Sequence, residues 1–278
     1  MLAALLALAA SVTYGTSDFI AGLESRRRSV WSVTAVSQPA ALLVAGLLLA
    51  LHWAPLTSPG YALAAVLGGV GAGIAVVAYY LALSSGTMSV VAPIVAVCAL
   101  VPVLAGLAGG ERVSLPQYAG MALALGGIVL SSRAEARGNG RAGLRSVAYA
   151  VIAAAGFGAM MVGLGIGGEK DVYWSVFGAR VGSMAAIFAY LGVRRPALDV
   201  PRRAIPALAA VGILGVIANA LFTVASTMGY LSVVAVLATL APVVIAAYAR
   251  AFLQERLSPL QLGAAAVVLV GVVCLAVG

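Results

Sequence analysis

Charged residues are scarce in this sequence. They make up 9% of its 278 residues, whereas hydrophobic residues make up 63%. Soluble domains average about 25% charged and about 45–50% apolar residues. This chain therefore has more apolar surface than one water-soluble core can bury, and we expect it to lie in a lipid bilayer. The net charge of +8 comes almost entirely from arginine. Since these arginines fall in short loops between apolar runs, they favour anchoring at the cytoplasmic membrane surface over nucleic-acid binding.

Residues that serve catalysis or hold metals are also few. The chain has one histidine, His52, and two cysteines, Cys98 and Cys274, which both lie inside apolar stretches. No HExxH motif, paired carboxylate site or phosphate-binding glycine loop is present in the sequence. We therefore predict no cofactor, no metal site and no ATP hydrolysis within this chain. We interpret the cysteines as small buried hydrophobic residues and His52, beside Trp53, as a residue of the membrane interface.

Long apolar runs fill the chain. About 20 consecutive apolar residues cross the hydrocarbon core of a bilayer as a helix. Ten runs of this kind are present, at roughly residues 2–22, 31–51, 61–83, 87–108, 115–132, 144–166, 172–193, 204–226, 230–250 and 258–277. The hydrophilic stretch 133–143 separates two halves of five runs, residues 1–132 and 144–278. We predict an all-α polytopic membrane protein with ten transmembrane helices and a cytoplasmic linker at 133–143.

The loop charges predict how the chain is oriented in the membrane. The loops on one side and their edges hold thirteen arginines, within residues 26–28, 133–145, 194–203 and 250–256. The opposite side holds only Arg112 and Lys170. Loops rich in lysine and arginine stay in the cytoplasm. We therefore expect a multi-pass protein of the inner membrane with both termini in the periplasm.

The end of the second half repeats the end of the first. Residues 86–127 and 229–271 share a glycine, a Ser-Val-Val-Ala run, a Glu-Arg-x-Ser turn, a glutamine and a final glycine. With five helices in each half, the second half would insert upside down relative to the first. The arginine triplet 26–28 accordingly has Glu169-Lys170-Asp171 in its place in the second half. We predict two inverted five-helix repeats around a central cavity, an arrangement found in many transporters.

Both halves resemble the EamA-type unit of the drug/metabolite transporter superfamily. The first helix of that unit carries an aromatic-Gly motif, here Tyr14-Gly15 and Phe157-Gly158, and its closing motif stands here at residues 111–127 and 255–271. The family commonly has tryptophan where Tyr14 and Phe157 stand, and the second copy lacks a proline matching Pro93. The resemblance implies a ten-helix carrier that exports amino acids or other small metabolites. The aromatic amino-acid exporters are one branch that fits.

Two charged side chains, Asp18 and Arg180, lie well inside the predicted spans. A charge at the centre of a membrane helix costs about 2.5–3.5 kcal/mol on insertion scales, so each needs a reason to be there. Arg180 could anchor a substrate carboxylate through two parallel hydrogen bonds, or it could snorkel or pair with another helix. Asp18 could relay protons or hold an amine, or it could pair with the arginines at 26–28.

Amide and aromatic residues complete the candidate substrate site. Buried amides must find hydrogen bonds in another helix or in a ligand. Aromatic rings can form an apolar pocket with a cation–π contact to an amine, or they can pack at the membrane interface. The predicted substrate-lining residues are Tyr14, Asp18, Gln38, Tyr79, Tyr80, Phe157, Met161, Arg180, Asn219 and Phe222. The candidate hinges, which could equally be static kinks, are Pro93, Pro102 and Pro242.

Together these features predict a secondary transporter that exports small metabolites, above all amino acids, by alternating access. It would act as a monomer in the lipid bilayer on a small-molecule substrate, driven by the substrate gradient or by protons. An intramembrane enzyme acting on a lipid-linked substrate is the alternative, but it would need His, Asp, Glu or Ser residues clustered near one membrane face. A channel would repeat polar rings around a pore, whereas internal duplication favours a carrier.

Overall fold

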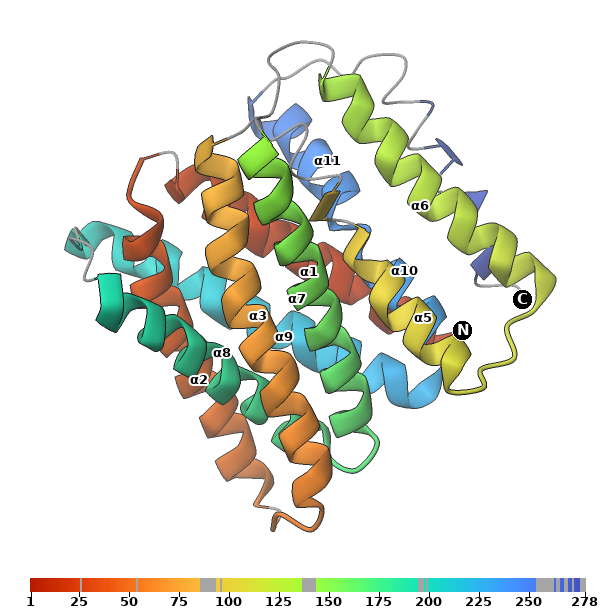
Figure 1. Ribbon diagram of the computed structural model, residues 1–278, viewed down its shortest axis with the longest axis horizontal. Helices are drawn as coiled ribbons and strands as arrows, with labels where there is room; N and C mark the ends of the chain where they lie inside the picture. The colour runs from red at the N-terminus through yellow and green to blue at the C-terminus, as the bar shows by residue number, and fades with distance from the viewer. Residues whose placement is uncertain are drawn as a thin grey trace.

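The computed structural model is a bundle of α-helices (Figure 1). It describes residues 1–25, 27–53, 55–85, 94–95, 97–136, 144–194, 198, 200–253, 263, 266–267, 270–271 and 273–275. Within these residues, six helices are long and apolar enough to cross a membrane. These six correspond to the first three and to the sixth, seventh and eighth predicted spans, so each half of the chain contains three helices of membrane-spanning length and composition.

The described part of the first half contains three long helices, then two short ones and another long one. They are α1 (Leu2–Ser25), α2 (Val30–His52), α3 (Pro59–Ser85), the 3₁₀ helix η1 (Val97–Ala99), α5 (Leu100–Ala108) and α6 (Leu115–Ala136). Ser29 begins α2 by accepting a hydrogen bond from the Ser32 backbone N–H, as an N-cap does. Trp53 ends α2 in the left-handed conformation, with φ of 50°.

The second half follows the same plan. Its helices are α7 (Leu144–Gly168), α8 (Val172–Arg194), the 3₁₀ helix η2 (Arg202–Ala204), α9 (Ile205–Met228), α10 (Leu231–Ala238) and α11 (Ala241–Leu253). Asp171 begins α8 by accepting a hydrogen bond from the Trp174 backbone N–H. Most of the predicted tenth span lies outside the described residues.

The ninth predicted span is not one continuous helix. It consists of α10 and α11, with Thr239 and Leu240 in a turn between them. Pro242 has no backbone N–H to donate to the Ala238 carbonyl four residues earlier, which explains why α10 ends at Ala238. Pro102 likewise follows a change from 3₁₀ to α geometry, because η1 gives way to α5 two residues before it. The third candidate hinge, Pro93, lies outside the described residues, as does the side chain of Pro242.

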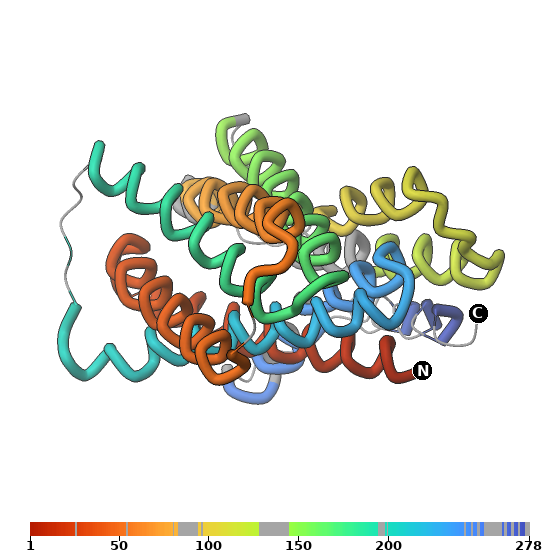
Figure 2. The backbone as a smooth tube through the Cα atoms, turned by 90° about the horizontal axis from the view of Figure 1, so that it is seen from below, coloured from red at the N-terminus to blue at the C-terminus, as the bar shows by residue number. Residues whose placement is uncertain are grey.

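Helices of the two halves pack together in matching pairs. α3 packs along α7 and α8, and α9 packs along α1 and α2. By their order along the chain, α1, α2 and α3 of the first half correspond to α7, α8 and α9 of the second. The third long helix of each half therefore packs along the first two long helices of the other half. The α1–α2 and α7–α8 connections occupy matching places in the halves, yet they lie at opposite ends of the bundle (Figure 1). Figure 2 shows the same bundle turned by 90°.

Glycine allows the closest of these helix contacts. A Cβ atom at Gly69 of α3 would collide with the backbone of Ala179 in α8, and one at Gly73 would collide with the backbone of Ser183. Close approach of this kind is typical of small residues between membrane helices, where packing drives association. It brings α8, which carries Arg180, against the centre of the bundle.

Candidate functional site

A hydrogen bond joins α1 to α9 in the middle of the bundle. The Tyr14 hydroxyl donates to Oδ1 of Asn219 at 2.5 Å. Asn219 is only 1% exposed, and its backbone carbonyl accepts a second bond from the Thr223 hydroxyl. Residues far apart in the sequence thus meet at one polar point within apolar helices, and this point connects the two halves.

The guanidinium of Arg180 lies at the same place. A Cβ atom at Gly215 of α9 would be 3.2 Å from its Nη2 atom, and Gly215 is one helical turn before Asn219. Arg180 also lies close enough to the Tyr14 hydroxyl to interact with it electrostatically. We call Tyr14, Arg180 and Asn219 the Tyr14 cluster.

Two hydrogen-bond donors of the Tyr14 cluster have no partner. Among the described residues, the buried side-chain N and O atoms without one are Ser11 Oγ, Arg180 Nε and Asn219 Nδ2. A buried polar group without a partner costs about 1–3 kcal/mol, and such groups are rare in folded proteins. Both N–H groups belong to the Tyr14 cluster, so the cluster can donate to a further acceptor.

Asp18 lies one helical turn beyond Tyr14 on the same face of α1. Its side chain is exposed. Among the described residues it has no ion pair, and Arg28 pairs instead with Glu24 at 2.7 Å. Pairing with Arg28, one alternative for Asp18, is therefore not seen, and Arg26 lies outside the described residues.

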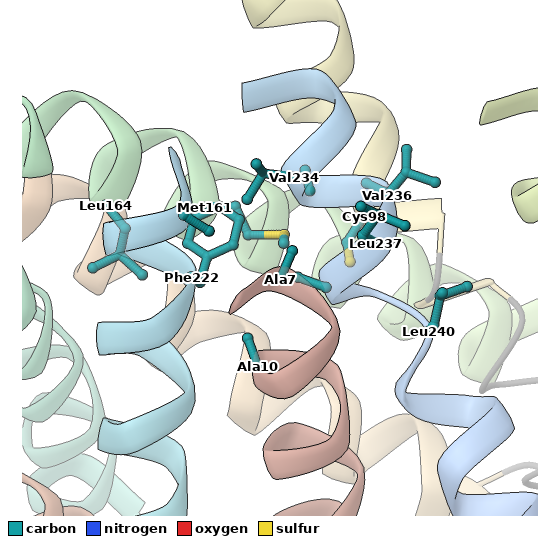
Figure 3. Packing of buried hydrophobic residues seen from close by; sticks show 14 of the residues in the cluster. Ala7, Ala10, Cys98, Met161, Leu164, Phe222, Val234, Val236, Leu237 and Leu240 are labelled. Atoms are coloured by element: carbon teal, nitrogen blue, oxygen red, sulfur yellow. The ribbon is translucent and has the colours of Figure 1, made fainter. Parts of the chain in front are cut away.

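The remaining predicted site residues divide between α2 and the packed core. Gln38 is half-buried on α2. Tyr79 and Phe157 form an edge-to-face pair between α3 and α7, with ring centroids 6.3 Å apart. Met161 and Phe222 are 4% and 0% exposed and lie side by side in the main hydrophobic cluster (Figure 3). The side chain of Tyr80 lies outside the described residues.

The structure also shows contacts that the sequence did not predict. Glu111, considered above only as part of a repeated motif, binds the start of α10 through three hydrogen bonds. At the end of α2, His52 stacks on Tyr173 with ring centroids 4.0 Å apart, and its Nε2 lies 3.3 Å from Oδ2 of Asp171. His52 thus joins α2 to α8 at one end of the bundle. The repetition of the Glu-Arg-x-Ser motif was the only sequence signal for any of these contacts.

Comparisons with known proteins agree with this architecture. A crystal structure of another protein superposes on the chain with a TM-score of 0.81, covers 98% of this chain and 95% of its own, and is 18% identical in sequence. At that identity the likeness concerns the fold alone. No curated protein sequence matches the chain. The model of the EamA-like transporter family matches residues 1–133 and again residues 144–277. Because these two matches cover nearly all of the sequence, the chain belongs to the EamA-like transporter family, whose members are transporters and not enzymes.

Proposed function

We propose that this membrane transporter exports amino acids, or similar small metabolites that carry a carboxylate, by alternating access. The observation that carries the proposal is the pair of unpartnered donors in the Tyr14 cluster, Arg180 Nε and Asn219 Nδ2. Family membership makes secondary transport of a small molecule the activity to explain and removes the enzyme alternative.

A carboxylate supplies what the Tyr14 cluster lacks. Its two oxygens accept hydrogen bonds from a guanidinium in a planar, parallel arrangement, and such charge-assisted bonds are stronger than neutral ones. Another lone pair of the same carboxylate can accept a hydrogen bond from the Asn219 amide N–H. Each donor that gains a partner no longer incurs a desolvation cost of about 1–3 kcal/mol, and this relief becomes binding free energy for the solute.

Asp18 is placed to take the amino group of the same solute. At about 1.5 Å per residue, it lies about 6 Å along α1 from Tyr14, a separation comparable to the size of an amino acid. Its exposed carboxylate can meet a solute amino group. The aromatic pair of Tyr79 and Phe157 is consistent with an apolar or aromatic solute side chain.

Alternating access follows from two inverted repeats, residues 1–132 and 144–278, acting as a monomer. The matching helix pairs and the placement of matching connections at opposite ends support the inversion. The breaks beside Pro102 and Pro242 would let the fourth and ninth spans bend. The arginine-rich end would face the cytoplasm of the inner membrane and both termini the periplasm.

The test is counterflow in proteoliposomes with a panel of amino acids and their decarboxylated amines. Wild type should exchange at least one amino acid and none of the corresponding amines. Arg180→Ala should lower that exchange by about tenfold or more, because a hydrogen bond to a charged group contributes about 1.5–3 kcal/mol. Arg180→Lys keeps the charge but loses the planar guanidinium, so its exchange rate should lie between those of wild type and Arg180→Ala.

Arg203→Ala is the matched control, because Arg203 is exposed in η2 at the end of the bundle. It should exchange like wild type. Normal exchange by Arg180→Ala, or equal transport of amines and amino acids, would contradict the carboxylate site. Uptake that does not saturate would contradict a carrier altogether.

A further inference from the structure

The Glu111 side chain makes three hydrogen bonds between the two halves of the chain. Its Oε1 accepts a hydrogen bond from the Leu231 backbone N–H at 2.6 Å. Its Oε2 accepts from the Ser232 backbone N–H at 3.2 Å and from the Ser232 hydroxyl at 2.5 Å. Both carboxylate oxygens are thus bound to the first turn of α10, a helix more than 110 residues away in the sequence.

The backbone before Glu111 holds its side chain in this position. Gly110 turns the chain with φ of +89°, a conformation that favours glycine. The Glu111 N–H then bonds to the Gly106 carbonyl at 3.0 Å, which brings the carboxylate back over α5. A Cβ atom at Gly106 would collide with that carboxylate, so the side chain fits only because residue 106 has none.

The first turn of α10 needs an acceptor, and Glu111 provides it. The N–H groups of a first helical turn have no partner within the helix, and Tyr230 at the N-cap gives no side-chain hydrogen bond. A carboxylate at this position also interacts favourably with the helix dipole. The result is that α5 of the first half is bound to α10 of the second half by charge-assisted hydrogen bonds.

Other contacts between helix ends lie at the same end of the bundle as the Glu111 contact. His52 meets Asp171 there, and Gly229 packs beside Ala3 at the start of α1. This is the end opposite the α1–α2 connection (Figure 1). At this end α5 packs on α7 and α10, and α10 packs on α1, so separation of α5 from α10 would loosen the contact between the halves.

We propose that the Glu111 carboxylate, bound to the first turn of α10, is a latch that holds this end of the transporter closed and releases when the site opens toward it. The proposal rests on the alternating-access mechanism above. The donor Ser232 belongs to the Ser-Val-Val-Ala run of the second half, and the acceptor Glu111 belongs to the Glu-Arg-x-Ser turn of the first half. The counterparts Ser89 and Glu255 lie outside the described residues, so the inference concerns the Glu111 contact alone.

The experiment measures opening directly and needs no substrate. Both native cysteines, Cys98 and Cys274, are replaced by alanine, and one reporter cysteine is introduced. Ala7→Cys reports on the latched end, because Ala7 is fully buried on α1 among the residues that surround α10 (Figure 3). Val33→Cys reports on general loosening, because Val33 is fully buried in a separate cluster at the start of α2. Sealed vesicles of both orientations are labelled with a membrane-impermeant maleimide.

Glu111→Gln should raise the labelling rate of the Ala7→Cys reporter by about tenfold from the latched end only, since a tenfold shift requires only about 1.4 kcal/mol. Ser232→Ala, which removes one of three bonds, should raise it less. Glu169→Gln is the matched control, because Glu169 is an exposed carboxylate at the same end, and it should leave the rate unchanged.

Two results would overturn the latch. One is an unchanged labelling rate of the Ala7→Cys reporter in Glu111→Gln. The other is an equal increase at the Val33→Cys reporter, which would make Glu111 a general stabiliser of the fold. Because the readout is conformational, a failed counterflow screen would refute the proposed substrate and leave this result standing.

Discussion

The buried amide of Asn219 should contribute little to stability and much to transport. In Tyr14→Phe, Oδ1 of Asn219 loses its hydrogen bond, while Nδ2 already has none. One newly unpartnered polar atom costs about 1–3 kcal/mol, so Tyr14→Phe should destabilise the protein by that amount. Asn219→Leu has the same side-chain branching and removes both polar atoms. It leaves the Tyr14 hydroxyl without its acceptor but also removes the unpartnered Nδ2. The number of unpartnered buried groups is therefore unchanged, and stability should change by less than about 1 kcal/mol.

Transport should respond in the opposite order. Asn219→Leu removes a donor that we assign to the solute carboxylate, and a hydrogen bond to a charged group contributes about 1.5–3 kcal/mol. Exchange should therefore fall by about tenfold to a hundredfold even though the protein remains folded. In Tyr14→Phe the donors of Arg180 and Asn219 remain, so exchange should fall less.

The assay pairs thermal melting in detergent with counterflow in proteoliposomes. Ser226→Ala is the control on the same helix, because its hydroxyl bonds only to the Thr223 carbonyl within α9, and it should transport normally. If Asn219→Leu melts well below Tyr14→Phe, or exchanges at the wild-type rate, the amide is a structural element and the reasoning fails.

Three further predictions follow from particular contacts. Gly69→Leu should destabilise the protein by at least about 1–3 kcal/mol through overpacking against α8. Gly126→Leu is the control, because open space surrounds Gly126, and it should melt like wild type. Similar melting temperatures for the two variants would contradict the tight α3–α8 contact. Gly106→Ala should displace the latch carboxylate and raise maleimide labelling at the latched end, and an unchanged rate would count against the latch. In intact cells, a cysteine at exposed Leu56 should react from outside and one at exposed Leu198 only after permeabilisation, and the reverse pattern would invert the proposed orientation.

The membrane fold was predictable from the sequence because hydrocarbon imposes few alternatives. A chain with so few charges must satisfy its backbone internally, so each long apolar run becomes a helix. The predicted helix boundaries were less accurate: α6 continues to Ala136, and the ninth predicted span divides into α10 and α11. These departures depend on local hydrogen bonds and on Pro242, whose effect on a neighbouring carbonyl is clear only when the helix geometry is known.

The candidate site was only partly predictable. Arg180 and Asn219 stood out because polar groups in apolar spans are costly, and the structure brings both to Tyr14. Met161 and Phe222 carried no such signal and lie in the packed core. The partner of Glu111 was hidden for a different reason: its bonds go mainly to backbone N–H groups, and no residue type marks those.

Composition and repetition by themselves determined that this chain is a membrane protein built from two related halves, because apolar run length and loop charge act locally along the sequence. Only the tertiary structure decided which helices of one half touch which of the other. That choice depends on close backbone approach at glycine and on single hydrogen bonds across long sequence separations. The sum of these contacts selects one packing among many that the apolar pattern alone would allow.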